Sequence, residues 1–135
     1  MSAEERSDAL PVTDPEALLH GWGRLAAEVV PLVAPVLLLV RAAAAHDPEV
    51  AALGAELDEA RRARMTANAR RLAAAGHLRP GLAVEHASDI LWMFTAPELY
   101  DLLVLRSGWD LPRFTTFVTD GLRAHLLAPG ADSSG

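Results

Sequence analysis

The 135-residue sequence predicts an all-α domain, a helical bundle of about five helices. Apolar residues make up 51% of the chain, but aromatic residues only 5%, and alanine is the commonest type. Ala, Leu, Arg and Glu favour helices, whereas the residues that favour strands are scarce. Apolar residues also recur at spacings of three and four along most of the chain, as on one face of a helix.

Composition and charge exclude several classes of function. The net charge is −6, and all 12 basic residues are arginine, which we interpret as the coding bias of a GC-rich bacterial genome. The sequence has no cysteine, which excludes disulfides, thiolate metal sites and cysteine nucleophiles. An acidic chain also lacks the basic footprint of a nucleic-acid-binding domain. Because no signal peptide begins the chain, we expect a cytoplasmic protein.

The ordered domain is expected over residues 13–128. Residues 1–12 are polar and acidic and are predicted to form a disordered leader or linker remnant, and residues 129–135 a flexible tail. Thr13 can cap the first helix in a capping box, although Asp14, which is followed by proline, competes for that role.

The first helical pattern runs to about Ala45 and contains twelve consecutive apolar residues, Val29 to Val40. A membrane span needs about 20 such residues, so we interpret this run as a core helix and expect no membrane association. Pro31 and Pro35 interrupt it, and proline removes a helical hydrogen bond and crowds the preceding turn. We therefore predict a bend or break at 28–35, with a packing gap beside it that is useful for a cavity.

A second long helix is predicted over residues 48–75, with Asp47 as its N-cap and Pro48 at its first position. Five arginines fall between residues 61 and 71. Acids precede this cluster and no aromatic residue lies within it, so a solvated helix face is favoured over a nucleic-acid surface. Asp58 and Arg62 have the spacing of a weak ion pair within one helix.

Two or three further helices complete the pattern. Gly76 is placed for a left-handed cap, and a third helix is expected over 83–95. Pro97 either kinks this helix or opens a new one. Asp110 is predicted to cap the last helix, whose apolar residues repeat at helical spacing.

The sequence gives little support for a metal site, a cofactor or catalysis. Glu85, His86 and Asp89 share one helical side, but three residues of one helix rarely suffice to hold a metal. No nucleophile motif or phosphate loop is present, so we do not expect an enzyme. A helical enzyme that uses His86 and Asp89 is a minor alternative.

A ligand pocket accounts better for the polar residues inside apolar stripes, such as Asn68, Asp89 and Thr95. Unpaired burial of such groups costs about 1–3 kcal/mol, so they need partners or a wet cavity. Large, adaptable Trp and Met side chains can supply the remaining surface. The predicted pocket residues are Trp22, Leu25, Val29, Val33, Met65, Asn68, Leu72, Asp89, Trp92 and Met93. For each one alone, a place in a packed core is an equally good interpretation.

The segment 89–109 reads D-I-L-W, then A-P-E-L-Y-x-x-L-V-x-x-x-G-W, and R-R-L-A-A-A-G-H-L-R-P precedes it at 70–80. This order resembles the C-terminal, effector-binding half of the tetracycline-repressor (TetR) family of bacterial transcription regulators. The resemblance covers roughly Asp14 to Leu127 and implies an effector pocket enclosed by the first three helices. It transfers no ligand identity, because family members differ widely in their effectors.

The resemblance also implies a homodimer built through the last two helices. The residues it places in that interface are Leu99, Leu103, Phe114, Phe117, Val118, Leu122 and Leu126. The family's N-terminal helix-turn-helix has no counterpart in these residues, so we expect the chain to sense a small apolar or amphipathic effector and to dimerise without reading DNA alone. The alternative is a stand-alone small-molecule-binding protein, or a decoy that pairs with a full-length relative.

Overall fold

The computed structural model describes residues 14–129 and confirms the all-α prediction over that range. The predictions for residues 1–12, for Thr13 and for residues 130–135 lie outside it. The helices are α2 (Pro15–Glu28), α3 (Val30–Ala44), α4 (Pro48–Ala74), α5 (Val84–Phe94), α6 (Pro97–Tyr100) and α7 (Leu111–Leu126), with a π-helical segment, η1 (Asp101–Arg106), continuing α6. Pro97 thus opens a new helix, which is one reason the helices outnumber the predicted five.

Aspartates begin three of the helices. The side chains of Asp14, Asp47 and Asp110 accept a backbone N–H bond from two or three residues further on, at 3.0, 2.9 and 2.9 Å. A proline follows within the first two positions of α2, α4 and α7, where no backbone donor is needed. The predicted caps of α4 and α7 are confirmed.

Two glycines end helices. Gly76 follows α4 and Gly108 follows η1, with φ angles of 76° and 74° that favour glycine. The next residue in each case donates a backbone bond to a carbonyl five or six residues back, at 2.9 Å for His77 and 3.0 Å for Trp109. The left-handed cap predicted at Gly76 is therefore confirmed.

The chain bends sharply between α2 and α3, as the two prolines predicted. The two helices meet at 60° across a break at Val29. Pro31 lies in the first turn of α3, and α3 continues past Pro35 to Ala44. Among the described residues no single helix is long and apolar enough to cross a membrane, and α2 and α3 meet that criterion only when taken together.

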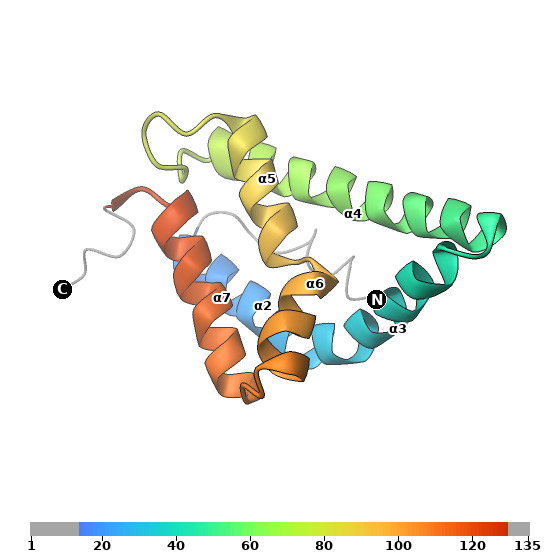
Figure 1. The fold of residues 1–135 in the computed structure, drawn as a ribbon. Coiled ribbons are helices and arrows are strands. Elements are labelled where there is room, and N and C mark those ends of the chain that lie inside the picture. The colour runs from blue at the N-terminus through green and yellow to red at the C-terminus, as the bar shows by residue number, and fades with distance from the viewer. Residues whose placement is uncertain (1–13, 130–135) are drawn as a thin grey trace.

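The helices pack in pairs, some of them consecutive in the sequence and some distant. α2 lies against α7, α3 against α4 and α6, and α4 against α5 (Figure 1). α4 extends along one side of the molecule and meets α3 at its far end, while α7 and the α6–η1 segment run beside each other (Figure 1). The bend between α2 and α3 thus faces α4 across the interior.

The apolar stripe of α7 closes the core of this single chain. Phe114, Val118, Leu122 and Leu126 are each at most 3% exposed. α2 and α5 cover this face, so these four side chains are not available to a second subunit. This corrects their sequence-based placement in a dimer interface. The predicted apolar stripe is present, but helices of the same chain cover it.

An alanine at Gly121 of α7 is expected to destabilise the fold, although alanine is the better helix former. A Cβ atom at this position would clash with Cζ of Phe94, and Phe94 is only 6% exposed. The overpacking cost of about 1–3 kcal/mol should outweigh the propensity gain of about 1 kcal/mol. We expect Gly121→Ala to lower the free energy of unfolding by about 1 kcal/mol in urea titrations.

Gly54 in α4 is the matched control. Its added methyl group would meet a Val40 methyl carbon at 3.3 Å, a contact that a small shift relieves. Gly54→Ala is expected to be neutral or stabilising, by up to about 1 kcal/mol. Equal effects at the two glycines would contradict the close approach of Phe94 to α7.

Candidate ligand-binding cavity

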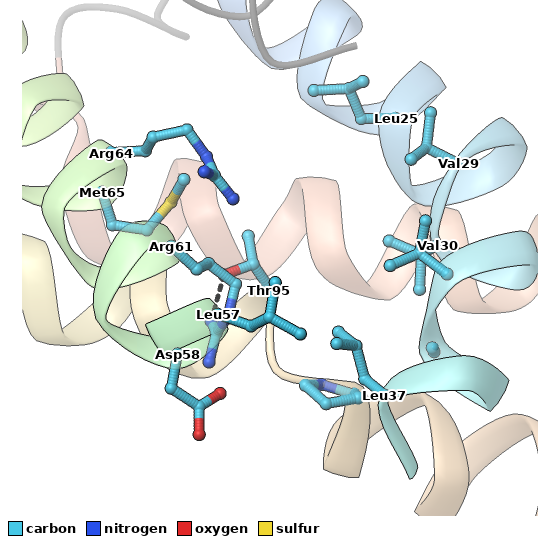
Figure 2. A pocket seen from close by; sticks show the side chains of 13 residues that line it. Leu25, Val29, Val30, Leu37, Leu57, Asp58, Arg61, Arg64, Met65 and Thr95 are labelled. Carbon is cyan, nitrogen blue, oxygen red and sulfur yellow. Dashed lines mark hydrogen bonds between the residues drawn. The ribbon is translucent and has the colours of Figure 1, made fainter. Parts of the chain in front are cut away.

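A cavity of about 220 Å³ lies at the α2–α3 bend, between that bend, α4 and the start of α6 (Figure 2). An engineered cavity of about 150 Å³ accommodates benzene, so this one has room for a small organic molecule. Its thirteen lining residues are Leu25, Val29, Val30, Val33, Ala34, Leu37, Leu57, Asp58, Arg61, Arg64, Met65, Thr95 and Pro97.

Most of the wall is apolar. α2 and α3 contribute only aliphatic side chains, and the polar groups come from α4 and from Thr95 after α5. Val33 and Leu57 are 44% and 40% exposed, so they place the rim of the cavity between α3 and α4. An apolar body would thus rest on the bent pair of helices, with polar groups on the opposite side.

Arg61 is a polar group of the wall that two hydrogen bonds hold in place. Its Nη1 donates to Oγ1 of Thr95 at 2.7 Å and to the backbone oxygen of Trp92 at 2.6 Å. Thr95 Oγ1 donates in turn to the carbonyl of Leu91 at 2.9 Å. Burial lowers the pKa of Arg61, and the nearby Asp58 acts in the opposite direction. The site therefore holds a partly desolvated, oriented guanidinium.

Asp58, the acid of the wall, is already occupied. Arg41 of α3 donates to both of its carboxylate oxygens, at 2.9 and 3.1 Å, and also to Glu98 of α6 at 3.3 Å. These bonds, above all the one to Asp58, raise the pKa of Arg41. They replace the predicted pair of Asp58 with Arg62. This Arg41–Asp58–Glu98 triad joins three helices that frame the cavity.

The arginine cluster of α4 is more engaged with the fold than the solvated face expected from the sequence. The guanidinium carbons of Arg61 and Arg62 lie 5.3 and 4.7 Å from the ring centroid of Trp92. Arg62 also pairs with Asp89 of α5, and Arg64 lines the cavity. The cluster thus joins α4 to α5 and supplies the cavity's positive charge.

Four predicted pocket residues, Leu25, Val29, Val33 and Met65, line this cavity. Trp22 lies deeper, beside a second cavity of about 60 Å³ that reaches into the core and shares Leu25 and Met65 with the first. The bend and α4 therefore meet as expected from their sequence patterns.

The other predicted pocket residues lie elsewhere. Asn68 and Leu72 are buried further along α4 and line neither cavity. Asp89, Trp92 and Met93 are exposed, because the inward face of α5 is formed by Ala87, Ser88, Leu91 and Phe94. This placement corrects the sequence-based pocket, which selected residues of α5 by their size and not by their helical register.

Sequence reasoning missed the polar side of the cavity. Leu57, Arg61 and Met65 follow one another at intervals of four residues, so the apolar pair already pointed to an inward Arg61. Glu85, His86 and Asp89 are all exposed. Within residues 14–129, no group of three or more His, Cys, Asp or Glu side chains is placed to hold a metal ion.

Comparison of the chain with protein-family models, with curated proteins and with solved structures finds no match.

Proposed function

We propose that this chain is the effector-sensing and dimerisation domain of a TetR-type transcription regulator of the bacterial cytoplasm. The cavity at the α2–α3 bend is the observation that supports this proposal most directly, because it joins an apolar wall to a few oriented polar groups. The resemblance of segment 89–109 to the family adds the regulatory context. DNA reading would require a helix-turn-helix segment outside these 135 residues.

A bound effector would act through the helices that frame the cavity. It would contact the bend on one side and α4 on the other, and the Arg41–Asp58–Glu98 triad links both to α6. The effector must bind one arrangement of these helices more tightly than another, because equal affinity shifts no equilibrium. A change at α6 and η1 would then reach the partner subunit and the attached DNA readers.

The proposed dimer surface lies at η1 and α7, where apolar side chains remain uncovered. Leu102 and Leu105 of η1 are 54% and 52% exposed, and Phe117 of α7 is 41% exposed. Leu99 and Leu103, on the same segment of the chain as Leu102 and Leu105, are half-buried against the core. A second copy that covers these residues would remove an apolar surface from water.

Filling the cavity tests the sensing function. Ala34 is 2% exposed and lines the cavity, so Ala34→Leu places three additional carbons in the space for a ligand. Two probes of equal chain length, 1-hexanol and hexanoate, are titrated calorimetrically. We expect Ala34→Leu to weaken the binding of both by about tenfold or more, as overpacking costs about 1–3 kcal/mol.

The matched control is Ala42→Leu, the same substitution at an exposed position of α3. It is expected to leave the binding of both probes unchanged. If neither probe binds the wild-type protein, or if both variants bind as the wild type does, the proposed sensing site is wrong. Sedimentation at micromolar concentration tests the dimer, and a monomer that binds the probes would favour the stand-alone alternative.

A further inference from the structure

We propose that the cavity selects a small amphipathic carboxylate, with its acid group at Arg61 and its apolar body against the α2–α3 bend. This inference rests on the proposed sensing function and names the class of its effector. The observation behind it is that positive side chains occupy one wall of an otherwise apolar cavity (Figure 2).

The geometry of Arg61 suits a carboxylate. Both of its hydrogen bonds, to Thr95 and to the carbonyl of Trp92, use Nη1. The Nε–Nη2 edge takes part in neither bond and carries the two parallel N–H groups that match the two oxygens of a carboxylate. Because those bonds already fix the guanidinium, a ligand would lose little side-chain entropy when it binds.

The charge balance of the wall also favours an anion. Asp58 is the acid of the cavity, and Arg41 binds both of its oxygens. In the described part of the chain, Arg61 donates only to neutral groups, Thr95 and the carbonyl of Trp92, so its positive charge stays at the wall. Figure 2 shows the Arg64 side chain extending from α4 toward the side where Leu25 and Val29 lie. A ligand cation would meet the Arg61 guanidinium, whereas an anion would pair with a charge that burial has partly stripped of water.

The shape of the cavity sets the size of the apolar body. Leu25, Val29 and Val30 lie across the cavity from Arg61 (Figure 2). The volume of about 220 Å³ exceeds the roughly 150 Å³ of a benzene-binding cavity by a modest margin. A short aliphatic chain or a ring thus fits beneath the carboxylate.

Three probes that share one aliphatic chain test this selectivity: hexanoate, 1-hexanol and hexylammonium, each titrated calorimetrically into the 135-residue chain at neutral pH. A hydrogen bond to a charged group contributes about 1.5–3 kcal/mol, so hexanoate should bind about 10- to 100-fold more tightly than 1-hexanol. Hexylammonium should bind more weakly than 1-hexanol. Arg61→Gln should remove the preference for hexanoate and leave the affinity for 1-hexanol within about twofold, because the apolar wall is retained.

Arg70→Gln is the matched control, since Arg70 lies on the same helix, is exposed and lines neither cavity. It should keep the full preference for hexanoate. Arg61→Lys keeps the positive charge but not the two-pronged edge, and should keep part of the preference. Retained binding of 1-hexanol by each variant shows that the cavity is still folded.

The outcomes separate this inference from the proposed function. If the wild type binds 1-hexanol as tightly as hexanoate, or if Arg61→Gln still prefers hexanoate, the carboxylate assignment is wrong and the sensing cavity stands. If no probe binds, the sensing function itself is overturned.

Discussion

Replacing Phe114 by alanine is expected to lower the free energy of unfolding by about 3–5 kcal/mol, the usual cost of emptying a buried aromatic site. Phe114 is 1% exposed, and its ring packs edge-on against Tyr100 with ring centroids 5.6 Å apart. It joins α7 to α6 inside one chain. The loss should appear in urea unfolding and should not depend on whether the protein is dimeric.

Phe117 is the matched position one turn later on the same helix. It is 41% exposed and contacts Trp109 and Phe94, with ring centroids 5.5 and 6.0 Å away. Phe117→Ala should lower the free energy of unfolding by only about 1 kcal/mol. It should, however, weaken self-association by about tenfold or more in sedimentation experiments, as expected for an aromatic residue of the proposed dimer surface. The reverse pattern would show that the stripe, and not the surface around Phe117, faces the partner.

Replacing Arg41 by methionine should have the second-largest effect, a loss of roughly 1.5–3 kcal/mol in the free energy of unfolding. The substitution keeps the length of the side chain but leaves the carboxylates of Asp58 and Glu98 without their shared partner. The side chains of Arg41, Asp58 and Glu98 are 31%, 34% and 52% exposed, so the loss is smaller than for a fully buried charge. Chemical denaturation measures it, and added salt should not restore the lost stability.

Arg24→Met is the control, because Arg24 pairs with Glu28 on the surface of α2, where both side chains are more than 60% exposed. An exposed pair of this type contributes well under about 1 kcal/mol. If the two variants lose the same stability, the triad does not hold the three helices together. The Arg41 variant should also bind 1-hexanol more weakly, because the triad holds together α3, α4 and α6 around the cavity.

Features set by local chemistry could be predicted from the sequence. Pro31 and Pro35 place a bend between residues 28 and 35 wherever the helix lies in the fold, and Asp47 before Pro48 starts a helix in almost any context. The structure has both features at the predicted positions. The all-α class follows in the same way from composition and periodicity.

The inward face of α5 could be read from the sequence, but only from its polar residues. Trp92 and Met93 follow Asp89 by three and four residues, and Asp89 follows Glu85 by four, so all of them lie on one polar side of the helix. Trp92 and Met93 were chosen for their size, yet both face outward, and Trp92 lies beside the guanidinium groups of α4. Helical register, and not side-chain size, therefore predicts this orientation.

The sequence could not show what covers the apolar stripe of α7. Periodicity identifies an apolar face, but a helix of the same chain and a helix of a second copy bury it equally well. Arg61 shows the converse error, because its charge suggested solvent although Leu57 and Met65 place it on an inward face. Charge is a weaker guide to orientation than the apolar neighbours one turn away on either side.

The aliphatic wall formed by α3 has an evolutionary consequence. Of the fifteen residues of α3, only Ala34 is fully buried, whereas the α2–α7 contact holds the largest core side chains. Substitutions at the partly exposed aliphatic positions of α3, Val30, Val33 and Leu37, can therefore reshape the cavity at little thermodynamic cost to folding. Under the proposed sensing function, a lineage of such proteins would diversify its ligands by drift in this one helix, while the scaffold stays under purifying selection.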